Sequence, residues 1–331
     1  MPRFKNYVPE GVIPAVLLPF KEDCSIDAQA FRRHLLDVGG VDGVTALTLN
    51  AHSTEVSSCS FDEQREVLEL GLDAVGGRLP IINGIYADGS IEAQRIARMA
   101  AEAGASGLLV FPPNVFRNGQ RPEMAVEHFR RIAEVTDLPL VLFQYPLAGG
   151  MGYPLATLLK IVDAVPSVRA IKDGCASPEL HEQHIRSLQA LPRPVNVLST
   201  HSAWLFSSLV MGCNGLLSGS GSVIADLQAR LYRAIRTDDL VSARALNTRI
   251  RATSTVFYAE PRADMHNRMK EALVLLGKLR CAAVRPPLVK LSSAEIQRIR
   301  LALIAAGLLA ADGGANDDVR NLGMLEKSAA E

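Results

Sequence analysis

One short pattern occurs three times in the sequence, and it constrains the fold more than any other feature. In each copy a helix-like segment ends at a Gly-x-x-Gly tetrapeptide, and a short apolar run follows; the copies begin at Gly40, Gly104 and Gly212. The first glycine suits a left-handed residue that ends a helix, and the second suits a tight loop into a buried strand. The pattern is typical of the helix-to-strand half of a βαβ unit.

Extending this interpretation along the chain predicts eight strands that alternate with eight helices. The predicted strands are residues 12–18, 44–49, 80–84, 107–111, 139–143, 168–172, 195–199 and 214–218. The predicted helices are residues 27–38, 61–75, 89–103, 122–135, 155–164, 178–190, 201–211 and 223–235. Asp27, Asp88 and Ser177 are expected to cap the helices that follow them. The alternation favours an α/β fold, a (β/α)8 TIM barrel, and a doubly wound open sheet is the competing architecture.

The strand pattern stops after residue 236. Three helical patterns follow, at residues 238–258, 264–278 and 292–309. We therefore expect a barrel over residues 10–236 and a C-terminal helical extension, or appendage, over residues 237–310. The segment 311–331 is polar and rich in Gly, Asn and Asp at first, and is predicted to be a disordered tail.

The composition argues against several classes of protein. Lysine plus arginine and aspartate plus glutamate both number 35, so the formal net charge is zero and gives no signal for nucleic acid or an anionic membrane. No uninterrupted apolar stretch reaches about 20 residues, and the N-terminus lacks the apolar run of a signal peptide. The five cysteines are scattered and form no Cys-x-x-Cys pair. These features predict a reduced, cytoplasmic protein without structural zinc and without nucleic-acid or membrane partners.

Lys172 has the clearest chemical potential in the sequence because it ends the apolar run that begins at Val168. In a barrel, the carboxyl ends of the strands face the active site, and neighbouring strands enclose the inward side chains. Desolvation there would lower the pKa of the lysine and expose an amine that can condense with a ketone. The alternative is an ordinary surface lysine just past a strand.

Small polar residues follow the second predicted strand, from Asn50 to Glu55. Ser53 and Thr54 could turn hydroxyls and backbone N–H groups toward a carboxylate, and Glu55 could brace the loop. The alternative is a loop with no binding role.

Three stretches make the chain resemble the dihydrodipicolinate synthase / N-acetylneuraminate lyase family of class I aldolases, over about residues 10–308. Ala170–Asp173 matches the family segment whose lysine forms a Schiff base, and Phe143–Pro146 matches Tyr-Asn-x-Pro. Ala51–Glu55 stands where the family has Gly-(Ser/Thr)-Thr-Gly-Glu. The resemblance implies that Lys172 forms a Schiff base with pyruvate or another small 2-oxo acid.

Four departures from the family pattern matter as much as the matches. The tyrosine that moves protons in the family falls on Phe143, and the first hydroxyl of the loop motif falls on His52. The tyrosine that synthases contribute after the fourth strand falls near Asn114, and their arginine after Tyr-Asn-x-Pro falls on Ala148. Dihydrodipicolinate synthesis is therefore not expected.

Other residues must then move protons and complete the site. Tyr145 lies two residues after Phe143 and so on the same side of the strand, and the imidazole of His52 is suited to acid–base chemistry at neutral pH. The run that contains Gly219 follows the eighth strand, and the resemblance implies that it closes around pyruvate. The Gly-rich segment 146–153 is expected to select the second substrate, for which a sugar acid or an aromatic aldehyde fits.

The remaining histidines give no metal site. His181 and His184 are expected on a solvated helix face, and His128 and His266 lack carboxylate or cysteine partners at ligand spacing. His201 is expected at the rim of the barrel. We predict that no metal or other cofactor is needed.

The sequence thus predicts a class I carbon–carbon or carbon–oxygen lyase: an aldolase, a hydratase-aldolase or a dehydratase. The alternative is a barrel that has lost catalysis and binds a 2-oxo acid as a regulatory protein. A metal-dependent hydrolase is a third hypothesis, which requires a His/Asp/Glu cluster at several strand ends. Because family members are usually tetramers, the resemblance also implies a homo-oligomer, either a tetramer or a dimer.

Overall fold

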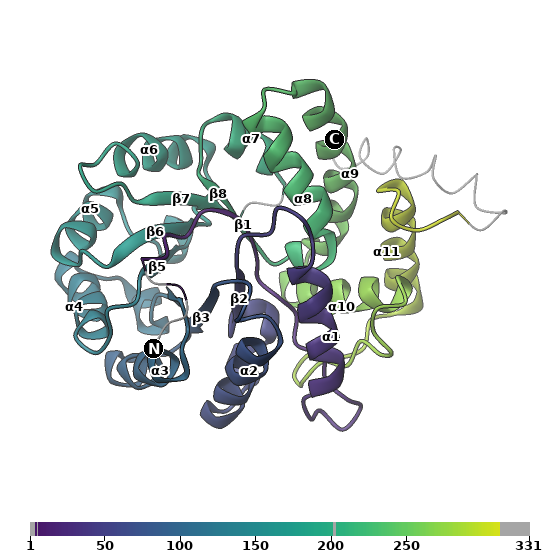
Figure 1. Cartoon of the computed structure of the whole chain (residues 1–331), viewed down its shortest axis with the longest axis horizontal. Helices are drawn as coiled ribbons and strands as arrows, with labels where there is room; N and C mark the ends of the chain where they lie inside the picture. Colours follow the sequence, from purple (N-terminus) through teal and green to yellow (C-terminus); the bar gives the residue numbers. More distant parts are fainter. Residues whose placement is uncertain (1–3, 5, 201–202, 312–331) are drawn as a thin grey trace.

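The computed structural model describes residue 4, residues 6–200 and residues 203–311, and it shows a closed barrel of parallel strands (Figure 1). The strands are β1 (Gly11–Pro14), β2 (Leu47–Leu49), β3 (Ile81–Ile85), β4 (Gly107–Val110), β5 (Leu140–Gln144), β6 (Val168–Asp173), β7 (Asn196–Ser199) and β8 (Gly215–Ser218). Strands β2 to β8 pair with one another in chain order, and β1 pairs with β8. Parallel bridges from Val12 to Val44 and from Ala15 to Thr48 join β1 to the β2 segment. The TIM barrel is confirmed, and the open sheet is excluded.

Helices surround the barrel (Figure 1). The α-helices of the barrel are α1 (Ala28–Gly39), α2 (Phe61–Ala74), α3 (Ser90–Ala103), α4 (Pro122–Ala133), α5 (Leu155–Ala164), α6 (Pro178–Leu188), α7 (Leu205–Val210) and α8 (Gly221–Arg236). The 3-10 helices are η1 (His52–Thr54), η2 (Val56–Ser58), η3 (Asn114–Asn118), η4 (Leu147–Gly149) and η5 (Arg262–Asp264). The strand–helix alternation predicted from the sequence is therefore confirmed.

Several predicted local details differ from the structure. Asp27 and Ser177 cap α1 and α6 as predicted, but α3 begins after Gly89, and Asp88 instead accepts a hydrogen bond from Asn114. Gly40 has a right-handed backbone with φ of −83°, so its predicted left-handed role is wrong. The positive φ of that copy of the Gly-x-x-Gly pattern belongs to Gly43, at 94°.

Several predicted elements are shorter in the structure, and two of them border the site. The first strand was expected over residues 12–18, but the N–H of Leu17 donates to the hydroxyl of Ser222 on α8 instead of to a neighbouring strand. The helix predicted over residues 201–211 is described only as α7, and residues 201–202, with the predicted rim residue His201, lie outside the described residues.

Three further helices form the appendage: α9 (Leu240–Phe257), α10 (Met265–Leu275) and α11 (Ser293–Ala305). They lie on the side of the barrel formed by α8 and α1 (Figure 1). Residues 312–331, nearly all of the predicted tail, lie outside the described residues. Within the described part of the chain, no helix has the length and apolar character needed to cross a membrane.

Alternating residues of the strands fill the interior of the barrel with apolar side chains. This inner cluster contains Ile13, Ala15, Ala46, Ala51, Ile82, Leu109, Phe111, Val141, Phe143, Ala170, Leu198 and Leu217. Because side chains alternate along a strand, Lys172 points to the same side of β6 as Ala170. The fold therefore directs the lysine into the barrel, at the carboxyl end of its strand.

Candidate active site

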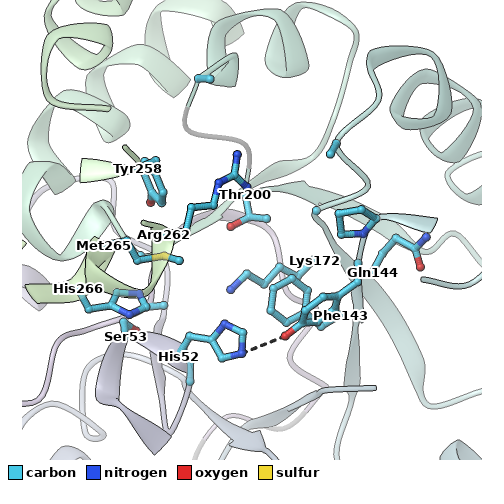
Figure 2. A pocket seen from close by; sticks show the side chains of 18 of the residues that line it. His52, Ser53, Phe143, Gln144, Lys172, Thr200, Tyr258, Arg262, Met265 and His266 are labelled. Atoms are coloured by element: carbon cyan, nitrogen blue, oxygen red, sulfur yellow. Dashed lines mark hydrogen bonds between the residues drawn. The ribbon is translucent and has the colours of Figure 1, made fainter. Parts of the chain in front are cut away.

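A cavity of about 460 Å³ opens at the carboxyl ends of the strands (Figure 2). It is lined by Ala15, Ala51, His52, Ser53, Phe143, Gln144, Tyr145, Pro146, Lys172, Gly174, Ala176, Thr200, Ala203, Trp204, Gly219, Tyr258, Arg262, Met265 and His266. The strand ends provide most of this lining, and the appendage provides the rest. The catalytic face of a TIM barrel lies at this same end.

Lys172 reaches into the cavity and is only 5% exposed. Its Nζ lies 4.2 Å from the centre of the Phe143 ring, and no described residue that lines the cavity is acidic. Burial lowers the pKa of Lys172 to about 7, because the ammonium form loses its hydration. A large fraction of the amine is therefore uncharged and nucleophilic near neutral pH, and the interpretation as an ordinary surface lysine is wrong.

His52 and Tyr145 form a hydrogen-bonded pair beside the lysine, with 2.9 Å between Nε2 and the phenol oxygen (Figure 2). Burial, assisted by the positive charge of Lys172, lowers the pKa of His52 to about 3. Burial raises the pKa of the Tyr145 phenol above its ordinary value. Both side chains are therefore neutral near pH 7. They share one hydrogen bond, and both line the cavity.

The three predicted substrate-binding residues have different positions. Ser53 lines the cavity with a buried hydroxyl that has no hydrogen-bond partner among the described residues. Thr54 does not line the cavity, because its hydroxyl and its N–H both donate to the carbonyl of Ala51. Gly219 lines the cavity, and a Cβ at this position would lie 3.4 Å from Nε2 of His266. The structure thus brings Ser53 and Gly219 to the site and directs the donors of Thr54 elsewhere.

The loop that carries His52 and Ser53 is held by Glu55, as the sequence predicts. Glu55 has a left-handed backbone with φ of 51°, and its carboxylate is almost fully buried. It forms an ion pair with Lys270 of α10 and accepts a hydrogen bond of 3.1 Å from the N–H of Arg285. A buried ion pair thus joins the active-site loop to the appendage.

The prediction of a solvated face for His181 and His184 is wrong. Both imidazoles are buried, and each Nδ1 lies within 2.8 Å of the same carboxylate oxygen of Asp173. Burial alone would raise the pKa of Asp173, but the two imidazole hydrogen bonds outweigh it and hold that pKa well below its ordinary value. Sequence periodicity missed this contact because Asp173 lies on the side of β6 opposite to Lys172 and contacts α6.

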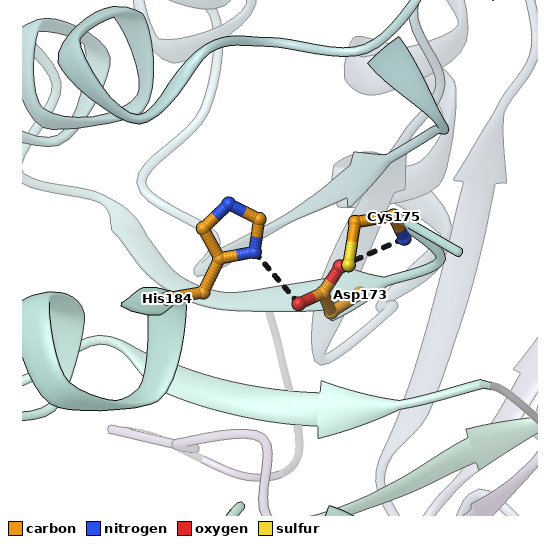
Figure 3. Close-up of side chains that lie close together, drawn as sticks. All are labelled: Asp173, Cys175 and His184. Carbon is orange, nitrogen blue, oxygen red and sulfur yellow. Dashed lines mark hydrogen bonds and ion pairs between the residues drawn. The ribbon is translucent and has the colours of Figure 1, made fainter. Parts of the chain in front are cut away.

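Asp173, Cys175 and His184 bring potential metal-ligand atoms within 4.8 Å of one another (Figure 3). Both oxygens of the carboxylate are already engaged, since the other one accepts a hydrogen bond of 3.0 Å from the N–H of Cys175. Burial raises the pKa of the Cys175 thiol well above its ordinary value, which disfavours the thiolate that binds metals. The geometry thus favours a hydrogen-bonded support of β6 over a metal centre.

Sequence reasoning missed four cavity residues from the appendage: Tyr258, Arg262, Met265 and His266. The rule that strand ends carry the site covers only the barrel, and no motif marks the segment between α9 and α10. Tyr258 accepts a hydrogen bond of 3.1 Å from the N–H of Ser220, next to Gly219. His266 was considered only as a metal ligand, yet its side chain lines the cavity.

The predicted specificity segment, residues 146–153, contributes only Pro146 to the described lining. Its far end is fixed at Tyr153, whose N–H and carbonyl both bond to the side-chain amide of Gln144, at 3.0 Å each. The segment therefore lies mostly beside the cavity, and the appendage occupies more of the wall.

The fold and the site together define a (β/α)8-barrel protein with a buried lysine in its mouth. A family model described as the dihydrodipicolinate synthetase family matches residues 8–306, so the chain belongs to that family. It is 28% identical over 300 residues to the 4-hydroxy-tetrahydrodipicolinate synthase of Gluconacetobacter diazotrophicus, covering 91% of this chain and 98% of that protein. It is 27% identical to the enzyme of the same name from Maridesulfovibrio salexigens, covering 91% and 99%.

Solved structures show the same fold. The dihydrodipicolinate synthase of Thermotoga maritima superposes with a TM-score of 0.84 at 24% identity, over 92% of this chain and all of that one. A prophage protein of the dihydrodipicolinic acid synthase family from E. coli K12, solved in complex with pyruvate, gives a TM-score of 0.85 at 23% identity, over 91% and 99%. The predicted family is confirmed, and the low identities agree with a divergent member.

Proposed function

We propose that this chain is a class I lyase that forms a Schiff base between Lys172 and pyruvate or another small 2-oxo acid. The carrying observation is the position of Lys172, buried in a cavity without a described acidic residue, with its pKa lowered to about 7. An amine with this pKa is nucleophilic at neutral pH and can still be protonated as an intermediate collapses. The pyruvate complex of the prophage protein supports the choice of substrate.

The chemistry begins with attack of the uncharged Nζ on the ketone carbon of the 2-oxo acid. The ketone oxygen gains two protons and leaves as water, which gives the iminium. In an aldolase, the substrate carries a hydroxyl on its fourth carbon. This hydroxyl loses its proton as the bond between the third and fourth carbons breaks, so that the fourth carbon leaves as an aldehyde, and the electron pair of the broken bond passes to the iminium nitrogen and leaves an enamine. Protonation of the third carbon and hydrolysis release pyruvate and restore Lys172. In a dehydratase, removal of a proton from the third carbon gives the enamine, and hydroxide then leaves the fourth carbon.

The His52–Tyr145 pair is our candidate for proton transfer. If the Nε2–H of His52 donates to the phenol oxygen, the phenol proton is free to bond to a substrate oxygen. The 2.9 Å separation and the neutrality of both groups support this relay, which compensates for the phenylalanine at position 143. The hydroxyl of Ser53, which has no partner among the described residues, is the candidate donor to the carboxylate of the 2-oxo acid. Gly219 lines the same cavity and adds no side chain to it.

We do not expect the synthesis reaction for which the relatives are named. Ala148, which stands where synthases have an arginine, is exposed and does not line the cavity, and Phe143 offers no hydroxyl. The alternative of a regulatory barrel draws support from Phe143 and Ala148, which replace the family tyrosine and arginine. The His52–Tyr145 pair favours an active enzyme.

Borohydride trapping tests the proposal. The full chain is incubated with pyruvate and sodium borohydride, and the site of the reduced adduct is located by peptide mass spectrometry. We expect one adduct, on Lys172, and its loss in Lys172→Met. Lys160, which is exposed on α5, provides the matched control Lys160→Met, for which trapping should be unchanged. An absence of adduct on Lys172 in the wild-type chain would refute the proposal, and trapping without turnover of any 2-oxo acid would favour the regulatory alternative.

The oligomeric state remains a prediction from the family. We expect a homotetramer or a dimer by size-exclusion chromatography with light scattering. A monomer at micromolar concentration would contradict it.

A further inference from the structure

We propose that Arg262 is a specificity-determining residue that binds a second anionic group on the substrate. The inference rests on the proposed Schiff-base chemistry, and it identifies the class of substrate as a 2-oxo acid with a second carboxylate or similar anion. It places the distal anion site on the appendage, at η5, instead of on the barrel loop where the synthases have their arginine.

The first argument is the charge of the cavity. Among the described residues that line it, Lys172 and Arg262 are the two whose side chains can carry a permanent or readily gained positive charge near pH 7, and none is acidic. The pKa of both lining imidazoles, on His52 and His266, is lowered by burial, so they are neutral. Once Lys172 has reacted at the ketone, one carboxylate beside it balances the iminium. The guanidinium of Arg262 then remains to attract a second anion.

The second argument is size. A cavity of about 460 Å³ is far larger than a three-carbon acid, and its wall continues from Lys172 on β6 to residues of the appendage. Figure 2 shows Lys172 and Arg262 entering the same cavity from different elements. A substrate that begins at Lys172 and extends toward the mouth would therefore meet Arg262.

The third argument is that Arg262 is available for exchange. Its present partner is Glu260, with 3.3 Å between the guanidinium Nε and the carboxylate, and the two side chains are 68% and 79% exposed. Exposed pairs of this kind contribute little to stability, so a substrate carboxylate can replace Glu260 at small cost. The planar guanidinium can also bind a carboxylate through two parallel hydrogen bonds.

The chemical surroundings of Arg262 agree with this role. Tyr258 and His266 line the same wall and can donate hydrogen bonds, whereas Phe143, Tyr145 and Trp204 provide ring surfaces elsewhere in the cavity. The polar groups on the appendage are thus placed for the distal part of the substrate. The aromatic groups suit its carbon chain.

The experiment compares 2-oxo acids that differ only in the distal charge. The full chain is trapped with borohydride in the presence of 2-oxoglutarate or 2-oxoadipate, and separately with the monoanionic comparators 2-oxohexanoate and 2-oxoheptanoate, which have no distal charge. The concentration for half-maximal modification of Lys172 is measured for each. We expect half-maximal modification at concentrations of the dianionic acids that are lower by roughly tenfold or more. This is the size of effect that a hydrogen bond to a charged group produces.

Two variants with opposite expected effects make the test specific. Arg262→Gln should remove the preference for the dianionic acids. Glu260→Gln removes the competing carboxylate and should strengthen the preference by about two- to fivefold. Arg244→Gln, at an exposed position of α9 outside the cavity, is the matched control and should behave as the wild type. Equal melting temperatures establish that each variant is folded.

The inference is overturned if the wild-type chain shows no preference for dianionic acids, or if Arg262→Gln retains it. Its failure can be separated from failure of the Schiff-base proposal by calorimetry on Lys172→Met, which cannot form an imine. In that protein, tighter binding of 2-oxoglutarate than of 2-oxohexanoate, lost in the double variant with Arg262→Gln, supports the anion site even if trapping of pyruvate fails. Equal binding of the two acids counts against it.

Discussion

The phenol oxygen of Tyr145 and Nε2 of His52 lie 2.9 Å apart at the carboxyl ends of β5 and β2, although 93 positions separate them in the sequence. The pair joins a hydroxyl and an imidazole where the family pattern places its proton-transfer groups. Phe143, which replaces the family tyrosine, packs against the Tyr145 ring with 4.6 Å between ring centres. The Tyr145 phenol thus lies two residues beyond Phe143, just after the end of β5.

If this pair moves protons, its loss should slow turnover but still allow Lys172 to form a Schiff base with pyruvate. We expect Tyr145→Phe and His52→Asn each to reduce kcat for 2-oxo acid cleavage by roughly 10²–10⁴-fold, the usual contribution of general acid–base catalysis. The double variant should be little worse than either single one, because the two groups act as a unit. Pyruvate should still be trapped on Lys172. Tyr86→Phe, whose ring packs on His52 without that hydrogen bond, is the control. Additive losses would argue against a relay.

The pKa of Lys172 makes a prediction about pH. Because the amine titrates at about 7 instead of 10.5, the rate of imine formation should rise between pH 6 and 8 and then level off. Pre-steady-state trapping with pyruvate, followed across this range, measures the rise. A rate that still increases tenfold per pH unit above pH 9 would show that the pKa of Lys172 is not lowered.

The same shift affects stability with a definite sign. The pKa of Lys172 is lower in the folded state than in the unfolded chain, so the unfolded chain binds more protons between pH 7 and 10.5. Burial of this amine therefore destabilises the fold fully below pH 7, and the penalty disappears as the pH rises toward 10.5. Lys172→Met should stabilise the protein at pH 6–7, on the order of 2–4 kcal/mol, and much less at pH 10. Chemical unfolding at several pH values checks it.

The ion pair of Glu55 and Lys270 should matter for both stability and the site. Lys270→Met leaves a buried carboxylate without its partner, which typically costs about 3–5 kcal/mol. Glu55→Gln in the Lys270→Met background should recover part of this loss, as a double-mutant cycle would measure. Arg186→Met breaks the exposed pair with Glu182 and should cost less than about 1 kcal/mol. Equal losses of stability in Lys270→Met and Arg186→Met would contradict a stabilising role for the buried ion pair.

Asp173 should stabilise the fold by its charge. Since its folded-state pKa is depressed, this contribution is present above the ordinary value of 3.8 and is lost as the pH falls below it. Asp173→Asn should cost about 3 kcal/mol at pH 7, because two buried imidazoles lose a charged acceptor. Asp226→Asn, at an exposed position of α8, should cost under about 1 kcal/mol. We expect a chelator to leave the melting temperature unchanged, and a clear fall would instead indicate a metal bound at Asp173, Cys175 and His184.

The sequence by itself pointed to the barrel and to Lys172 as the candidate lysine, because both depend on local order along the chain. Alternating helix and strand patterns favour a parallel barrel, and a lysine near the end of a buried strand is a candidate for its mouth. The period of a strand also placed Tyr145 on the side of Phe143 that faces the cavity. These inferences need only the neighbours of each residue in the chain.

The tertiary structure decided which distant groups meet. Asp173 and the two histidines of α6 are brought together by packing of a helix on the outer side of β6, which periodicity cannot distinguish from a solvated face. The donors of Thr54 are used within its own turn, although its residue type suited a ligand. Arg262 and His266 reach the cavity because the appendage folds back over the strand ends. Contacts of this kind depend on where elements far apart in the chain lie in space, and no local pattern records that position.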